Sequence, residues 1–224
     1  MRLLRHTFTL LLFSCVSLLA QPEKKSEIEI RMVAERLPAR LGKVALVSGE
    51  DRSEPFQLPM NNLSEPRLVS SRVFQLVSVE QNVSVAKVAL PAQGKSFVLL
   101  LIPTADKGYS PIVLPYNTPN FKAGDIYLYN NAKDTVVGMV GDGKFSVDPG
   151  KGTFFRPVIK DDNKRYHDVG IGVKFESGDR VISTTRWPKS NNTRYYVFFY
   201  VNPRTNRVAY RAVDEFLEPE PVAN

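Results

Sequence analysis

Side chains that do acid–base and nucleophilic chemistry are scarce in this sequence. The two histidines are His6 and His167, and His6 lies in an apolar N-terminal segment. A serine triad would therefore depend on His167 as its base. Asp168 cannot form a local dyad with it, because successive side chains of a strand point to opposite faces. No Gly-x-Ser-x-Gly nucleophile motif occurs. We predict that the protein has no catalytic residues.

Paired carboxylates are the chemistry of glycan hydrolases, and Asp161-Asp162 is the adjacent aspartate pair in the chain. It lies in the polar segment 160–164, where Asp and Asn favour a turn. Its spacing lacks the alternating oxygen ligands of a calcium loop. One histidine without a cysteine in the mature chain does not make a zinc site. We predict no metal ligands, and a carboxylate-based glycan hydrolase is the enzymatic alternative.

The segment from Gly138 to Lys144 is similar to a phosphate-binding loop up to its lysine. Phe145 then stands where a Ser or Thr would have to reach the metal. A strand follows, whereas a phosphate site needs the N-terminus of a helix. We interpret these glycines as a β-hairpin turn and predict no cofactor.

Aromatic side chains offer the binding hypothesis. Tyr196, Phe198 and Tyr200 alternate along one face of a strand, and the preceding strand ends in Trp187. An exposed row of these rings beside Arg194 could stack on sugar rings or form a protein interface. The interpretation that we favour over an exposed row is that the rings are core between two sheets.

The elements that would position these residues are strands. Apolar and polar residues alternate with period two, turn residues recur every 8–12 residues or so, and no segment has a sustained helical period. The segments 95–102 and 194–201 are apolar on both faces, which is typical of central strands that are covered on both sides. We predict an all-β fold, an antiparallel β-sandwich with two packed Ig-like lobes.

Two turns have a defined chemistry. Asp142-Gly143 lies between apolar runs and favours a two-residue hairpin with positive φ at both positions. Asp148-Pro149-Gly150-Lys151 has the Pro and Gly positions of a type II turn. Both belong to 121–157, which we interpret as four short strands.

The division into domains follows the prolines. We expect a signal peptide at 1–20, an N-terminal β lobe at 21–102, a Pro-rich connection at 103–120, a C-terminal β lobe at 121–213 and a flexible tail at 214–224.

The N-terminus predicts export. Arg2 and Arg5 precede an apolar stretch that ends in Ala20, the pattern of a secretory signal peptide. Lipoprotein anchoring through Cys15 is the minority alternative. Cleavage would leave a chain without cysteine and with five more basic than acidic side chains. We expect the periplasm or the surface of a bacterium, with no integral membrane span after cleavage.

Part of this pattern resembles a known class of proteins. Gly124-Asp125, Asn130 and Pro149-Gly150 are similar to elements of exported bacterial envelope β-sandwich modules, such as the AlgF-like alginate acetylation accessory factors. The resemblance covers 121–157 and implies an envelope β-sandwich without a catalytic site of its own. It transfers no functional residues.

These observations predict an exported, non-catalytic envelope protein with a binding or assembly role. Its partners would be an envelope protein or an anionic glycan, and nucleic acid is not expected because the basic residues form no concentrated stripe. The alternatives are a carbohydrate-binding module that uses exposed aromatics and the carboxylate-based hydrolase.

Overall fold

The computed structural model describes residues 27–158 and 163–217. The expected signal peptide, Cys15 and the Asp161-Asp162 pair lie outside these ranges. The described chain is all β, and no helix in it is long and apolar enough to cross a membrane. Its first eight strands are β1 (Ile28–Ala34), β2 (Val44–Ser48), β3 (Asp51–Arg52), β4 (Arg67–Val69), β5 (Val73–Ser78), β6 (Val83–Ala89), β7 (Ser96–Pro103) and β8 (Tyr109–Pro115). The second eight are β9 (Ile126–Asn130), β10 (Val136–Val140), β11 (Gly143–Val147), β12 (Gly152–Phe155), β13 (Tyr166–Val173), β14 (Arg180–Pro188), β15 (Thr193–Asn202) and β16 (Arg207–Phe216).

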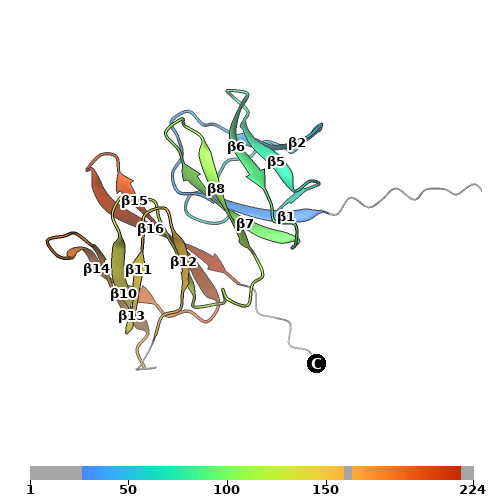
Figure 1. The fold of residues 1–224 in the computed structure, drawn as a ribbon. Helices are drawn as coiled ribbons and strands as arrows, with labels where there is room; N and C mark the ends of the chain where they lie inside the picture. The colour runs from blue at the N-terminus through green and yellow to red at the C-terminus, as the bar shows by residue number, and fades with distance from the viewer. Residues whose placement is uncertain (1–26, 159–162, 218–224) are drawn as a thin grey trace, which may run out of the picture.

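The strands form four sheets of four strands each. Sheet A has the order β4-β1-β7-β8, sheet B β3-β2-β5-β6, sheet C β12-β9-β15-β16 and sheet D β11-β10-β13-β14. Sheets A and B enclose one hydrophobic core, and sheets C and D enclose another. The predicted all-β sandwich of two lobes is confirmed, with the N-terminal lobe in blue and green beside the C-terminal lobe in yellow to red (Figure 1).

The two lobes share one topology. Adding eight to each strand number of sheets A and B reproduces sheets C and D in the same order. The first strand of each lobe also pairs with the seventh in parallel, β1 with β7 and β9 with β15. The other pairs between named strands are antiparallel, as expected. The fold is therefore an eight-strand sandwich that occurs twice.

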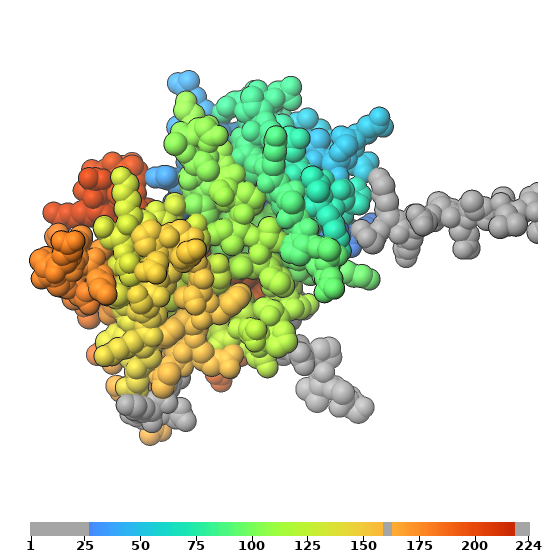
Figure 2. Space-filling view, viewed as in Figure 1, coloured from blue at the N-terminus to red at the C-terminus, as the bar shows by residue number. Residues whose placement is uncertain are grey.

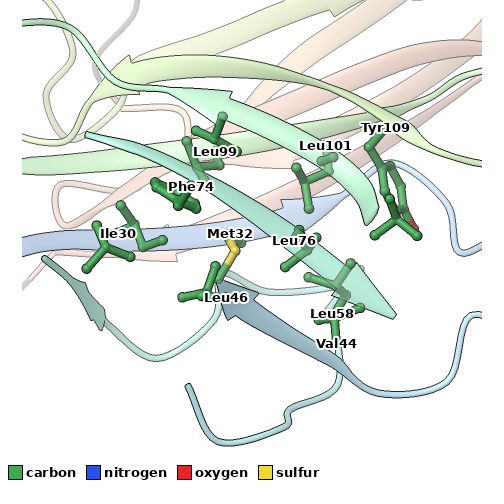
Figure 3. Close-up of a cluster of buried hydrophobic side chains, with 14 of the residues drawn as sticks. Ile30, Met32, Val44, Leu46, Leu58, Phe74, Leu76, Leu99, Leu101 and Tyr109 are labelled. Atoms are coloured by element: carbon green, nitrogen blue, oxygen red, sulfur yellow. The ribbon is translucent and has the colours of Figure 1, made fainter. Parts of the chain in front are cut away.

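The central strands β7 and β15 explain how the lobes pack. Phe97, Leu99 and Leu101 of β7 point into the N-terminal core, part of which Figure 3 shows. Val98, Leu100 and Ile102 point the other way and meet side chains of sheet C, including Tyr196 and Phe198 of β15. Sheets A and C thus pack face to face, so the layers follow the order B, A, C, D. Both faces of each strand are apolar because one faces its own core and the other faces the second lobe.

The two turns with predicted chemistry have different outcomes. In the first, Val140 pairs with Gly143, so the loop residues are Gly141 and Asp142 rather than Asp142-Gly143. Gly141 has a φ of +61° while Asp142 has no positive φ, as in a type II′ turn with Gly first. The hairpin itself confirms that the phosphate-loop likeness is a turn between strands. In the second, Gly150 has a φ of +70° and Lys151 N–H donates to Asp148 O over 3.1 Å, as a type II turn requires.

The Pro-rich segment contains a strand. Residues 109–115 form β8, which pairs with β7 at the edge of sheet A. An edge strand tolerates Pro111 and Pro115 because donors on its outer side need no ladder partner. The chain passes between the lobes over 116–125. At the other end, β16 continues to Phe216, so its last residues are part of sheet C rather than of a tail from 214.

Candidate interaction site

The expected aromatic row does not form a surface. Tyr196 is 1% exposed and Phe198 is fully buried, because this face of β15 packs against sheet A of the other lobe. Tyr200 is half-buried near the end of the same strand. The interpretation of these rings as core between sheets is therefore the correct one for Tyr196 and Phe198.

Arg194 is buried as well, in a polar cluster where the lobes join. Its guanidinium Nε donates to Glu215 Oε2 over 2.5 Å, and its Nη1 donates to the carbonyl oxygens of Tyr116 and Phe121 over 3.0 Å each. The Tyr196 hydroxyl donates to the same Glu215 oxygen over 2.7 Å. Burial raises the pKa of Tyr196, and the Glu215 carboxylate adds to that shift, so its hydroxyl stays a donor. Arg194 therefore holds the connection between the lobes and is not a contact for solvent.

Trp187, like Tyr200, is a predicted residue that is partly exposed. Its half-buried ring stacks on Tyr195 at 6.5 Å between centroids and meets Tyr210 at 6.1 Å. Tyr195 is on the face of β15 opposite to the predicted row. Of the two faces of β15, the predicted row with Tyr196 and Phe198 is thus on the more buried one.

These rings belong to the side of the C-terminal lobe where β14 and β16 are the edge strands. We call it the aromatic seam, and it consists of half-buried residues that pack against the core on this side: Ile182, Trp187, Tyr195, Val208 and Tyr210. They pack against the core but are only partly buried. Figure 2 shows the orange segment that includes β14 at the margin of the molecule away from the N-terminal lobe.

The N-terminal lobe is closed at the equivalent position. There the edge strands are β6 and β8, which pack against each other. Tyr109 of β8 is 5% exposed and belongs to the core, and Val113 packs against it. In the C-terminal lobe, Ala212, Asp214 and Phe216 of β16 are exposed, and Phe216 has an exposed fraction of 72%. Sheet C thus extends beyond the cover that sheet D provides.

The buried carboxylates of the described chain have structural partners. Asp125 accepts two hydrogen bonds of 2.6 Å from Arg156, and Glu215 pairs with Arg194. Glu35 accepts from Asn131 Nδ2 over 2.7 Å, and its pKa is raised mainly by burial. No group of three or more acidic, histidine or cysteine side chains within the described ranges is placed to hold a metal ion.

His167 lies beside the aromatic seam, opposite Trp187 in the register of β13 and β14. It is 9% exposed at the start of β13, and its pKa is lowered by burial and by the charge of Lys189. Asp168 faces the other side of the strand, as predicted, and pairs with Arg186 over 3.1 Å. The two residues do not act together.

The fold and these surfaces define a tandem β-sandwich protein. The chain matches no model of a known protein family and no curated protein. The functional argument therefore depends on the geometry of its own residues.

Proposed function

We propose that the protein is a non-catalytic binding or assembly component of a bacterial envelope, and that the aromatic seam receives an extended segment of a protein partner. The observation that carries this proposal is the contrast between the lobes. The strands β6 and β8 pack closely in one lobe, whereas half-buried side chains such as Trp187, Tyr195 and Tyr210 lie between β14 and β16 in the other.

The seam suits an added strand. Edge strands present backbone donors and acceptors on one side, and an extended peptide can extend a sheet by pairing with them. Alternate side chains of that peptide would cover Ile182 and Val208 and complete the core. Aromatic residues with a polar end, such as Tyr210, are well suited to such an interface because they combine apolar area with a hydrogen-bonding group.

A protein partner fits better than a sugar at this place. The Trp187 ring is packed against Tyr195 and Tyr210, so it does not present a free face of the kind on which sugar rings stack. The ion pairs of Asp125 with Arg156 and of Glu215 with Arg194 support the non-catalytic part of the proposal. The N-terminal segment with Arg2, Arg5 and Ala20 supports export.

The test is capture from envelope extracts followed by hydrogen exchange. Immobilised full-length protein is compared with Trp187→Ala and Ile182→Glu, and Phe175→Ala is the control because Phe175 is 41% exposed outside the seam. We expect the wild type and the control to retain the same protein, both seam variants to lose it, and the amides of β14 or β16 to exchange more slowly in the complex. Equal retention by all four proteins, or protection elsewhere only, would contradict the proposal.

A further inference from the structure

The backbone of β16 is bonded to β15 on one side and lies at the edge of sheet C on the other. Leu217 N–H donates to Asn192 O over 2.7 Å, and these two residues continue the register of the β15–β16 ladder. Bonded and non-bonded pairs alternate in an antiparallel ladder, so the odd-numbered residues of β16 direct their N–H and C=O groups toward β15. The even-numbered residues direct theirs toward the edge, and each of them has an N–H group: Val208, Tyr210, Ala212, Asp214 and Phe216.

The equivalent edge strand of the N-terminal lobe is blocked by proline. Tyr116 N–H donates to Ser96 O over 2.9 Å, so the even-numbered residues of β8 bond to β7 and the odd-numbered ones point outward. Pro111 and Pro115 are therefore two of the four outward positions of β8, and neither has an N–H to donate. This edge of sheet A cannot bond to a complete strand.

The other edge strand beside the aromatic seam, β14, is interrupted. Lys189 N–H donates to Arg165 O over 3.0 Å. The same alternation directs the backbone of Thr184 and Pro188 toward the edge, where Pro188 has no donor. The register also shifts at Ile182, which has no partner in β13. Prolines and bulges protect sheet edges from added strands. Of the two described edges beside the seam, β16 is the one with an unbroken register and a donor at each outward position.

The side chains of the outward row of β16 lie on the core face of sheet C. Val208 and Tyr210 pack against the core of the C-terminal lobe. The next three are exposed: Ala212, Asp214 and Phe216. Alternate side chains of an added strand would lie on this face, directly opposite the row. Large apolar residues suit the positions opposite Ala212, whose small side chain leaves room, and opposite Phe216, which is 72% exposed.

Asp214 adds a charge to this otherwise apolar and aromatic row. It lies opposite Tyr195 in the register with β15, and it forms no ion pair with another described residue. The sequence beyond Leu217 contains two further acidic residues and no basic one. A lysine or arginine opposite Asp214 would form a favourable cross-strand pair, whereas an acidic residue there would be repelled. The charge also disfavours a wholly apolar strand, so it selects among partners.

On the basis of the proposed function, we propose that the partner adds an antiparallel strand to the edge of β16. This strand has a lysine or arginine opposite Asp214, between apolar residues opposite Ala212 and Phe216. The row of backbone hydrogen bonds supplies affinity, and the alternate side chains supply specificity. Antiparallel pairing is the more stable kind per residue. β14 contributes Trp187 to the covered face but does not bond to the added strand.

The test uses two synthetic peptides with the full-length protein. The peptide VTKTLTV places its lysine opposite Asp214 when it pairs antiparallel over 210–216, and VTETLTV places a glutamate there. Titration calorimetry measures both affinities, and hydrogen exchange followed by NMR reports the individual amides of β14 and β16. The edge variant Ala212→Pro removes one outward donor, and its matched control is Thr184→Pro on the edge of β14. Asp214→Lys reverses the charge without removing a donor.

We expect VTKTLTV to slow the exchange of the even-numbered amides from Tyr210 to Phe216, and to leave the odd-numbered amides, which are already bonded to β15, unchanged. VTETLTV should bind about fivefold more weakly, and Asp214→Lys should reverse this order. Ala212→Pro should lose about tenfold in affinity for VTKTLTV, whereas Thr184→Pro should stay within about twofold of wild type.

Three results would overturn this proposal: slower exchange in β14 instead of β16, no slowing by either peptide at millimolar concentration, or the same order of affinities in wild type and Asp214→Lys. None of them would remove the seam proposal, which is judged by the dependence of envelope capture on Trp187 and Ile182. A captured protein that Trp187→Ala loses and Ala212→Pro retains would likewise keep the partner at the seam while excluding an added strand on β16.

Discussion

Arg194 and Glu215 stand opposite each other in the register of β15 and β16 and form an ion pair that is almost fully excluded from solvent. Their Nε–Oε2 distance is 2.5 Å, and the same guanidinium binds the carbonyl oxygens of Tyr116 and Phe121. It also lies over the rings of both residues, at 4.8 and 4.6 Å from their centroids. A charge pair within a strand hairpin therefore fixes the chain segment that joins the two lobes.

Removal of this guanidinium is expected to destabilise the protein strongly. In Arg194→Met the Glu215 carboxylate stays buried without its cation, which typically costs about 3–5 kcal/mol. Arg194→Lys keeps the charge, but the lysine cannot reach both carbonyl oxygens. This variant should therefore lose an intermediate amount of unfolding free energy. Urea unfolding followed by circular dichroism measures both.

The matched control for this prediction is Arg186→Met. Arg186 also pairs with an acid, Asp168, but both side chains are mainly exposed, and such pairs contribute about 0–1 kcal/mol. If Arg194→Met lowered the unfolding free energy no more than Arg186→Met does, the buried pair would not stabilise the segment that joins the lobes.

Glu35 provides a pH-dependent prediction at the same interface between the lobes. Burial raises its pKa above the ordinary value of 4.5, against the opposing effects of Asn131, Arg36 and Arg211. The folded protein then binds this proton more tightly than the unfolded chain does. The stabilisation is complete below pH 4.5 and is lost as the pH rises through the raised pKa.

Glu35→Gln removes this titration while keeping a group that can accept from Asn131. Relative to wild type, the variant should therefore gain in unfolding free energy as the pH rises from 4.5 to 7. The measurement is a series of urea unfolding curves for both proteins across this range, because the difference cancels the other carboxylates. A difference that stays constant with pH, or falls, would show that folding does not raise this pKa.

The strands and the sandwich could be predicted from the sequence because their signals are local. The alternation of apolar and polar residues predicted β1 and β11. Pro and Gly in the 148–151 turn predicted its type II geometry. The hidden strand β8 was obscured by Pro111 and Pro115, since proline argues against a strand unless its position at a sheet edge is known.

The faces of β15 could not be assigned because their environment comes from a remote part of the chain. Both faces of this strand are apolar, and only sheet A, more than eighty positions earlier in the sequence, decides that Tyr196 and Phe198 are buried. Tyr195 and Tyr210 were missed for the same reason. One signal in the sequence could have helped. Arg194 lies near the start of an apolar strand and Glu215 near the end of the next, and a charged residue in an apolar strand is seldom buried unless it is paired with an opposite charge.

The glycines of sheet D give a prediction with an internal control. A Cβ at Gly138 would lie 2.5 Å from the carbonyl oxygen of Gly170 and 2.5 Å from the Phe145 ring, and the backbone oxygen cannot move aside without disturbing the ladder. Gly138→Ala should therefore cost about 1–3 kcal/mol.

At Gly170 the nearest atom to a new Cβ is Met139 Cγ at 3.4 Å, an ordinary contact. Gly170→Ala should be neutral or stabilise by up to about 1 kcal/mol, because alanine restricts the unfolded chain. Thermal and urea unfolding of the two variants measure this difference. Similar losses at both positions would indicate that the outer face of β13 is covered.

Trp187 is the single tryptophan of the sequence, so its fluorescence reports on the aromatic seam alone. Its contacts with Tyr195 and Tyr210 should each contribute about 0.5–1.5 kcal/mol, and Trp187→Ala should lower the unfolding free energy by about 1–3 kcal/mol. Phe175→Ala, with no ring partner among the described aromatic contacts, should stay within about 0.5 kcal/mol of wild type. Since the ring is half-buried, an added strand over the seam should shift its emission to shorter wavelength. Unchanged emission in a complex with the captured partner would place that partner elsewhere, even if Trp187→Ala destabilises the lobe as expected.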